Sequence, residues 1–439
     1  MRLAAGSRVV LLGLAVALVQ GGLALAMLGC PIFYGRQDPE KSLHDTRLFH
    51  QYAAEALGGK VPYRDYRIEY PLLAFPWMLL PGLLAADLGR YRTLFACEVL
   101  LFNAAAVVLV ARWVASKDGE RRVAGRLAWY SAFLLVLCPV AVSRFDLIPA
   151  SLAFAAAVAW ASGWSRSGGV LTGLGILTKI FPGVVVFPGL FWDLGRGRKA
   201  AFAGVSAVVL TLVVGSLAWL GLGGTRVLDS LGYHVDRGLE TGSTYAGWVA
   251  LGQRIAGEPV EAGFRFGSGQ LTSPLADRVA KLAFPLQALA LMTVAWRCRK
   301  SALSDPMRWA AAAVVGFVAF GKVLSPQFLL WPLPFLAAIP GSTGRAARPL
   351  FLAACLATTA VFPWAADHVS TFDSPGLLLL NTRNGLLLAL WAWLTFAPTR
   401  PSRTDPLALI RPHVALANAL VAAPVSMADA PPGSRPGIS

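Results

Sequence analysis

The sequence predicts an all-α polytopic membrane protein, and three observations support that class. Of the 439 residues, 56% are hydrophobic and only 14% are charged, whereas roughly 25% are charged in an ordinary soluble domain. Uncharged runs close to the length of about 20 residues that crosses a bilayer core recur along the chain. The net charge of +16 would suggest a nucleic-acid partner in a soluble protein, but basic loops of a membrane protein report its orientation instead. We therefore exclude a typical soluble enzyme and expect no nucleic-acid partner.

The predicted spans begin with residues 9–28. This run follows Arg2 and Arg8 and is longer than the core of a signal peptide, so we expect a retained anchor. Further uncharged runs of about the required length lie at 92–113, 127–143, 146–163, 200–221, 276–296, 349–366 and 376–397.

Two longer runs are interrupted, and each is expected to form two short helices. The run 168–193 carries Lys-Ile-Phe-Pro at 179–182, and the run 309–340 is broken over 321–327, where a proline can restart a helix. With these pairs the sequence predicts a bundle of about 12 transmembrane helices.

The stretch 70–88 is expected to differ from a regular span. It holds Pro71, Pro76 and Pro81, a density that fits a re-entrant or interfacial segment better. If this stretch stays on its starting side, the basic loops face the cytoplasm and both termini are cytoplasmic.

This topology sets the organisation of the chain. Residues 1–398 form one transmembrane domain, with a first outer loop at about 29–69 and a second large outer loop at about 222–275. Residues 399–439 are expected to be a disordered cytoplasmic tail. Every polar interruption of the apolar runs then falls on the outer face, where ionisable groups near membrane depth are functional candidates.

The first outer loop contains a short amphipathic helix, predicted over 43–57 and ended by Gly58-Gly59. Tyr52 is expected on one face of this helix with Leu48 and Ala56. The Tyr/Arg/Pro-rich stretch that follows is expected to be an ordered binding surface.

Five motifs follow one another along the chain. The first is Asp45 on the short helix, followed by the pattern G-x-x-P-Y-R-D-x-x-x-E-Y-P at 59–71. The others are RFDLIP at 144–149, LTKIFP at 177–182, YHVDRGLE at 233–240 and KVLSPQF at 322–328. Together they resemble the polyprenyl-phosphate-sugar-dependent membrane glycosyltransferases of the GT-C fold, family GT87. Within that family the chain resembles the bacterial group that includes the actinobacterial phosphatidylinositol-mannoside mannosyltransferases. The resemblance covers roughly residues 8–398, and Leu72 departs from a second proline that is common there.

The resemblance implies an integral membrane hexosyltransferase of the cytoplasmic membrane, with its catalytic domain in 1–398 and its active site on the outer face. It would move one mannose-like hexose from a polyprenyl-phosphate-linked sugar donor to a lipid or glycan acceptor among membrane lipids. A polytopic transporter or lipid flippase is the alternative from another class. Transporters usually place polar sites near the midplane of repeated halves, and we find no internal repeat, so the enzyme is favoured. A glycan polymerase or ligase would accept a larger donor.

Inverting transfer from a lipid phosphate needs one carboxylate base, and Asp45 is the leading candidate. The resemblance implies the same role for an acidic residue at this position. Ser42-x-x-Asp45 also has the spacing of a capping box, so Asp45 could instead satisfy a helix amide. Asp65 and Glu69 are alternative bases, although the arginines beside them could form local ion pairs with them.

Cations must stabilise the leaving phosphate, and Lys179 and Lys322 lead because each lies at a helix break. Snorkelling of an interfacial lysine is the structural alternative. His234 and Arg237 are the next candidates. Arg144 could instead pair with Asp146, and Arg383 could anchor the last span.

The remaining candidates share a place on the predicted outer face. As substrate contacts we consider His44, Tyr52, Arg64, Asp65, Glu69, Tyr70, Arg144, Asp146, Gln327 and Arg383. In the second outer loop Tyr245, Trp248 and Phe264 could stack on sugar rings or pack the loop on the membrane. We expect no metal and no cofactor beyond the donor substrate, because the chain lacks an Asp-x-Asp motif and a monophosphate donor does not demand a metal.

Overall fold

The structure is a computed structural model that describes residues 2–28, 30, 43–229, 232, 236–299 and 305–398. In the described part the strands belong to one antiparallel hairpin, formed by β1 (Glu261–Arg265) and β2 (Ser268–Thr272), in which Glu261 lies opposite Thr272. The other regular elements are helices. The predicted all-α polytopic class is confirmed. The predicted disorder of the tail at 399–439 lies outside the described residues.

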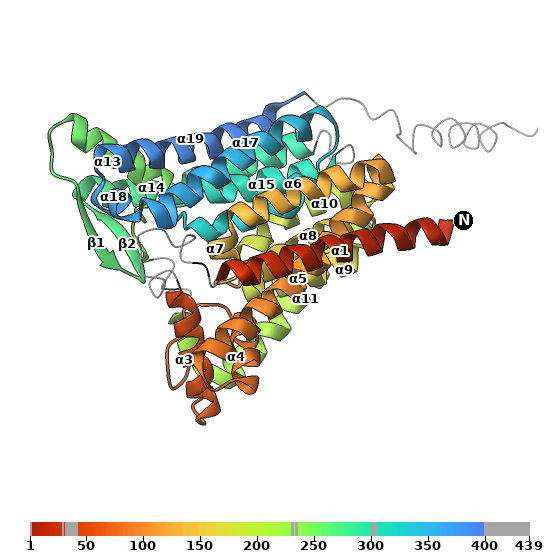
Figure 1. The fold of residues 1–439 in the computed structure, drawn as a ribbon, viewed down its shortest axis with the longest axis horizontal. Helices are drawn as coiled ribbons and strands as arrows, with labels where there is room; N and C mark the ends of the chain where they lie inside the picture. The colour runs from red at the N-terminus through yellow and green to blue at the C-terminus, as the bar shows by residue number, and fades with distance from the viewer. Residues whose placement is uncertain are drawn as a thin grey trace, which may run out of the picture. The chain divides into compact units, whose positions relative to one another are not determined.

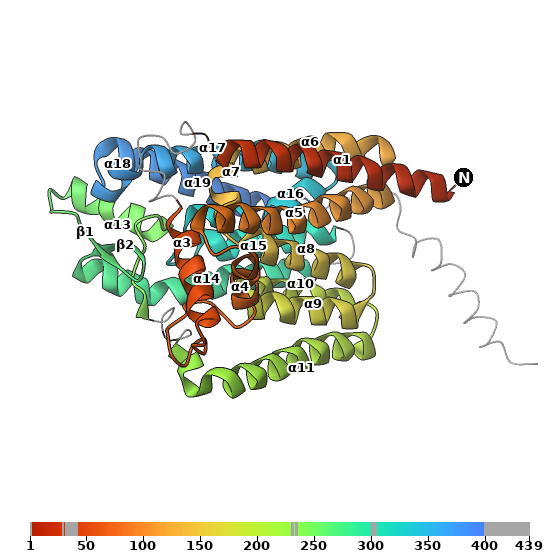
Figure 2. The same ribbon diagram turned by 60° about the horizontal axis from the view of Figure 1, so that its bottom comes forward.

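Among the residues that the structure describes, six helices are long and apolar enough to cross a membrane, by length and composition. They run roughly along one direction in both views (Figures 1 and 2). These helices are α1 (Arg2–Leu28), α5 (Leu88–Asp118), α11 (Arg198–Gly223), α14 (Pro274–Cys298), α17 (Gly341–Thr359) and α19 (Ser374–Phe396).

Shorter helices fill the space between the long ones. They are α6 (Val123–Val136), α7 (Cys138–Ala141), α8 (Leu147–Ala161), α9 (Ser165–Thr178), α10 (Val186–Leu194), α15 (Pro306–Ala319) and α16 (Leu333–Ala338). α8, α15 and α16 are buried along most of their length. Such short helices are accommodated because neighbouring protein, rather than lipid, surrounds them. The total of about 12 spans stays a prediction.

Both predicted interruptions are present. Lys179 ends α9 in an extended conformation, and a 3-10 turn, η3 (Phe181–Val185), leads into α10. Residues 321–325 are likewise non-helical, and η5 (Pro326–Leu330) leads into α16. Pro182 and Pro326 stand near the starts of these turns, as expected for a residue that lacks a backbone donor.

The helix α11 is attached to the bundle by a close contact between small residues. Gly169 and Gly173 of α9 face it, and a Cβ on Gly169 would clash with the carbonyl of Gly204. This G-x-x-x-G spacing lets two helix backbones approach closely in a membrane. Outward-facing residues of α11, such as Phe202 and Leu210, are exposed.

Peripheral elements gather at the end of the bundle where α1 ends (Figure 1). They are α3 (His44–Leu57), α4 (Ala74–Leu84), α13 (Thr244–Ile255), α18 (Ala366–Thr371) and the β1–β2 hairpin. Short turns η2 (Glu120–Arg122), η4 (Gly224–Leu228) and η6 (Ala360–Trp364) complete the described elements.

The helix predicted over 43–57 is present as α3, and Gly59 follows it with φ +90°. Its buried face is made by Thr46, Phe49, Tyr52 and Ala53. Leu48, Tyr52 and Ala56 are four residues apart in this helix and so share one face, as predicted; Tyr52 is buried and the other two are half-buried. At 70–88 the structure has α4, whose 11 residues rise too little, at about 1.5 Å each, to cross a bilayer core.

Arginines cap helix ends at the opposite end of the bundle. Arg308 donates to the carbonyls of Leu394 and Ala397, at 2.6 and 2.5 Å, where α19 ends. Arg196 donates to the last carbonyls of α8, and Arg126 to the carbonyl that follows α16. A cation at a helix C-terminus satisfies orphan carbonyls and complements the helix dipole.

Candidate active site

The carboxylate of Asp45 forms an ion pair with Arg144. Asp45 lies in the first turn of α3, and Arg144 lies in the turn between α7 and α8. The distance from Arg144 Nε to Asp45 Oδ2 is 2.8 Å, and the Asp45 side chain is 22% exposed. The local sequence favoured a pair of Arg144 with Asp146, but the Asp146 carboxylate pairs with Lys179 instead.

The surroundings of Asp45 keep it ionised. Burial alone would raise the pKa of this carboxyl, but Arg144 and His44, with Lys179 behind them, outweigh burial and hold the pKa below its ordinary value. In turn, a hydrogen bond to Asp45 raises the pKa of His44, which is 68% exposed. Asp45 is thus a partly open carboxylate held in its charged form.

Aromatic side chains form a wall beside this pair. The rings of Phe49, Tyr70 and Phe145 pack edge to face, with centroids 5.1 to 5.9 Å apart. The Tyr63 hydroxyl donates to the carbonyls of Tyr70 and Pro71, and these bonds hold the two ends of the 59–71 stretch together beside the aromatic wall. Burial, together with the charge of Asp45, raises the pKa of Tyr70.

A second ion pair lies behind the first. Asp146 is 1% exposed, and its Oδ1 accepts from Lys179 Nζ at 2.7 Å and from Trp331 Nε1 at 2.6 Å. The Lys179 ammonium also lies 4.8 Å from the centre of the Phe145 ring. Lys179 is therefore already neutralised by a buried carboxylate, which is how a buried charge is normally accommodated.

The two helix breaks meet at a stack of rings. Trp331 lies between Phe181 and Phe328, with ring centroids 4.0 Å apart on each side. Phe181 belongs to the first break and Phe328 to the second. Two motifs that are far apart in the sequence thus join in space.

A separate cluster, which we call the Glu240 cluster, contains Arg237, Glu240, Lys322 and Ser325. The carboxylate of Glu240 accepts from the Ser325 hydroxyl and from the Leu324 amide, both at 2.7 Å. Arg237 Nη2 lies 3.5 Å from the same carboxylate. The Glu240 amide donates to the Lys322 carbonyl, which fixes the second break against this loop.

Positive charge exceeds negative charge in this region. Burial and the neighbouring Arg237 lower the pKa of Lys322, against a smaller opposite effect of Asp236. Arg383 of α19 is fully buried and donates to the carbonyl of Gly242 at 2.6 Å. Its Nε and Nη1 have no hydrogen-bond partner within the described part of the chain.

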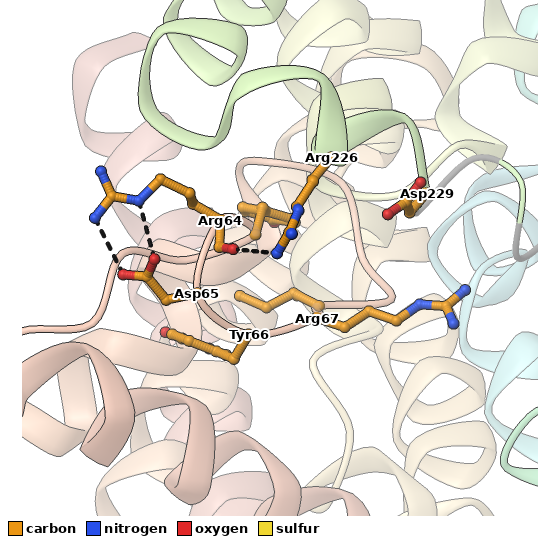
Figure 3. A pocket seen from close by; sticks show the side chains of 8 residues that line it. Arg64, Asp65, Tyr66, Arg67, Arg226 and Asp229 are labelled. Atoms are coloured by element: carbon orange, nitrogen blue, oxygen red, sulfur yellow. Dashed lines mark hydrogen bonds and ion pairs between the residues drawn. The ribbon is translucent and has the colours of Figure 1, made fainter.

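Arg64 and Asp65 of the first loop lie at a pocket beside Arg226, as Figure 3 shows. They bond to each other at 3.0 and 3.1 Å, and Arg226 donates to the Arg64 carbonyl. Both line a cavity of about 220 Å³ whose lining does not include Asp45. The Arg64 hydrogen bond and the Val61 amide lower the pKa of Asp65 to about 2. The structure therefore does not bring these two residues to the Asp45 pair.

The other predicted residues are placed as follows. Tyr52 is buried and its carbonyl accepts from the Tyr66 hydroxyl. Glu69 and Gln327 are half-buried, and His234 lies outside the described residues. Within the described ranges no group of three or more His, Cys, Asp or Glu side chains could hold a metal ion.

Sequence reasoning missed Trp331 and Glu240 as members of the site. Glu240 stood at the end of a quoted motif, three residues after Arg237, which was a usable signal. A tryptophan in an apolar run gives no such signal, because its role depends on Asp146, a residue far away in the sequence.

A helical membrane bundle that gathers an ionised carboxylate and several cations at one end has the features of a membrane enzyme that acts on charged substrates. The sequence model of glycosyltransferase family 87 matches residues 69–326, more than half of the chain. The chain belongs to glycosyltransferase family 87 and is a glycosyltransferase.

The chain is also similar to a solved structure. The crystal structure of ArnT from Cupriavidus metallidurans bound to undecaprenyl phosphate is similar, with 16% identity and a TM-score of 0.46. The likeness covers 93% of this chain and 80% of that one. No curated protein matches the chain.

Proposed function

We propose that the chain transfers a single hexose from a polyprenyl-phosphate sugar to a lipid or glycan acceptor, with inversion and with Asp45 as the general base. Membership in a glycosyltransferase family favours an enzyme over a transporter or flippase. The solved structure of ArnT that resembles this chain holds undecaprenyl phosphate. The motif resemblance to mannosyltransferases favours a mannose-like hexose.

In the proposed reaction the acceptor hydroxyl oxygen bonds to the anomeric carbon of the donor. The bond from that carbon to the phosphate oxygen breaks, and the phosphate leaves with the electron pair. Asp45 takes the hydroxyl proton. Because its pKa is low, it becomes an effective base only as the new bond makes the hydroxyl strongly acidic.

The Glu240 cluster is the best place for the leaving phosphate. Lys322 and Arg237 lie close enough for their charges to repel, and an anion between them would relieve that repulsion. Arg383 behind them adds a third cation. Lys179 was the other leading candidate, but its pairing with Asp146 gives it instead the role of holding the second ion pair beside Asp45.

The observation that carries this proposal is the link between the two groups of charges. Residues 322–331 form one short segment. At one end, Leu324 and Ser325 bond to Glu240, and at the other end Trp331 bonds to Asp146. The segment therefore connects the Glu240 cluster to Asp146, which lies two residues after Arg144, the ion-pair partner of Asp45. Fixed relations of this kind are what catalysis by orientation requires.

The proposal is tested with purified protein in nanodiscs and a panel of polyprenyl-phosphate sugars. The expected result is release of free polyprenyl phosphate with one sugar, and a product of inverted anomeric configuration by NMR. We also expect activity to persist in EDTA. If no donor in the panel released polyprenyl phosphate, the transferase proposal would be wrong. A product that retained its anomeric configuration would contradict the inverting mechanism. Activity lost in EDTA and restored by divalent cations would contradict a metal-independent reaction.

Donor size separates the remaining alternative. A glycan polymerase or ligase would act on a donor that carries an oligosaccharide and leave a single-sugar donor intact. The proposed site is on the outer face of the cytoplasmic membrane with both termini inside, which a cysteine-labelling experiment described in the Discussion tests.

A further inference from the structure

One apolar surface is uncovered although it does not belong to a membrane span. It includes Trp248, Leu251 and Ile255 of α13, which are three and four residues apart and so share one helix face. Trp248 is 51% exposed and Ile255 is 80% exposed. The opposite face of the helix is buried, so this face is the outer side of a well-packed element.

The hairpin adds Phe264, which is 79% exposed. Leu271 of β2 belongs to the same buried apolar cluster as Tyr245 and Val249 of α13. We call Trp248, Leu251, Ile255 and Phe264 the α13 surface.

This surface is continuous with lipid-facing parts of the bundle. β2 leads directly into α14, where exposed apolar residues begin at Leu275. α13 packs against both α14 and α19, and Leu378 near the start of α19 is 72% exposed. The α13 surface thus extends the apolar belt of two candidate spans beyond their ends.

We propose that the α13 surface is embedded in the interfacial layer of the lipid bilayer. Tryptophan is enriched at that depth, and a helix with one apolar face and polar flanks lies in the plane of the interface. An uncovered cluster of large apolar side chains on a soluble surface would be unusual.

The position of α13 gives this contact a consequence for the site. The helix starts at Ser243 and Thr244, directly after the loop that holds the Glu240 cluster. Thr244 and Tyr245 donate to the carbonyls of Ala319 and Phe320 at 2.8 and 3.1 Å, just before the second helix break. This consequence rests on the proposed function: an interfacial α13 keeps the Glu240 cluster at the depth of lipid phosphates.

The test measures the depth of nitroxide labels by EPR power saturation in nanodiscs. Cys30 and Cys97 are replaced by serine, which leaves three buried cysteines. Single labels are introduced with Ile255→Cys and Phe264→Cys. Glu258→Cys, in the exposed turn after α13, is the matched control, and Leu282→Cys on the exposed side of α14 marks the lipid.

At 255 and 264 we expect the ratio of oxygen accessibility to nickel-chelate accessibility to be severalfold higher than at 258 and close to that at 282, because oxygen concentrates in lipid. A ratio equal to that at 258 would mean that water covers the surface. Exclusion of both reagents would mean that protein covers it, and dipolar coupling between labels would then identify a second copy. Either result overturns the proposal. Neither measurement depends on sugar transfer, so a failure of the proposed function is seen separately.

Discussion

At the scale of single residues, the central feature is a carboxylate whose surroundings act in opposite directions. Burial favours the neutral form of Asp45, whereas Arg144 and His44 favour the charged form and prevail. The sequence predicted a general base at this position, with a helix-capping role as the alternative. The actual partner, Arg144, is 99 residues away, and no spacing rule reaches that far.

Asp45→Asn is expected to lower kcat by about 10²- to 10⁴-fold, the usual value of a general base, while the protein still folds. The change in kcat is measured from turnover of the donor in nanodiscs, and Asp65→Asn is the matched control. Wild-type turnover in Asp45→Asn would transfer the role of base to another carboxylate.

Arg144→Gln is expected to move the acid limb of the kcat/KM profile to higher pH. The pKa of Asp45 is depressed in the folded protein, so activity is lost only as pH falls through that low value. Removing Arg144 leaves burial, which raises the pKa, and protonation then begins at higher pH. Arg64→Gln, whose partner is Asp65, is expected to leave the limb in place. An unchanged limb in Arg144→Gln would refute the role of this pair.

Lys322→Ala is expected to raise the KM for the donor by about tenfold or more, the effect of losing one charge-assisted contact, with little change in acceptor KM. Lys60→Ala, an exposed lysine of the first loop, serves as control. An effect on acceptor KM alone would contradict the proposal that Lys322 binds the donor phosphate.

At the scale of elements, the breaks at 179–182 and 321–327 could be predicted because proline and lysine interrupt apolar runs there. Their association could not be predicted. It depends on the rings of Phe181, Trp331 and Phe328, and each ring alone looks like an ordinary apolar residue. The helix α3 was predictable from its amphipathic pattern and from the Gly58-Gly59 pair that ends it. Which of its residues are buried depends on the elements that pack against it.

Gly169→Ile is expected to lower the free energy of unfolding by about 1–3 kcal/mol, because the added atoms push α11 away from α9. Thermal unfolding in detergent measures the change. The matched control is Gly221→Ile, since a Cβ at Gly221 meets no atom within 4 Å. Equal effects at both positions would show that α11 does not depend on this contact.

At the scale of the whole molecule, the net charge of +16 lies mostly in basic loops that are predicted to face the cytoplasm. Arg126, Arg196 and Arg308 also have a structural role, because each donates to helix carbonyls at the end opposite the site. Composition alone could not distinguish these arginines from ligand-binding ones.

With the predicted orientation, a thiol reagent is expected to reach Lys199→Cys from the cytoplasmic side and Glu258→Cys from the outer side. The measurement uses a membrane-impermeant maleimide on intact and on opened spheroplasts, in protein without Cys30 and Cys97. Labelling of Lys199→Cys in intact cells would invert the topology and place the site on the cytoplasmic face.

The stack of Phe181, Trp331 and Phe328 also has a mechanical consequence. A break in a membrane helix is normally a hinge, and the breaks at 179–182 and 321–327 are two such places. Because Trp331 is held on both faces and at its N–H, neither break can bend without moving the other. Two potential hinges thus become one stiff unit, and any adjustment to acceptors of different size has to come from the loops around that unit.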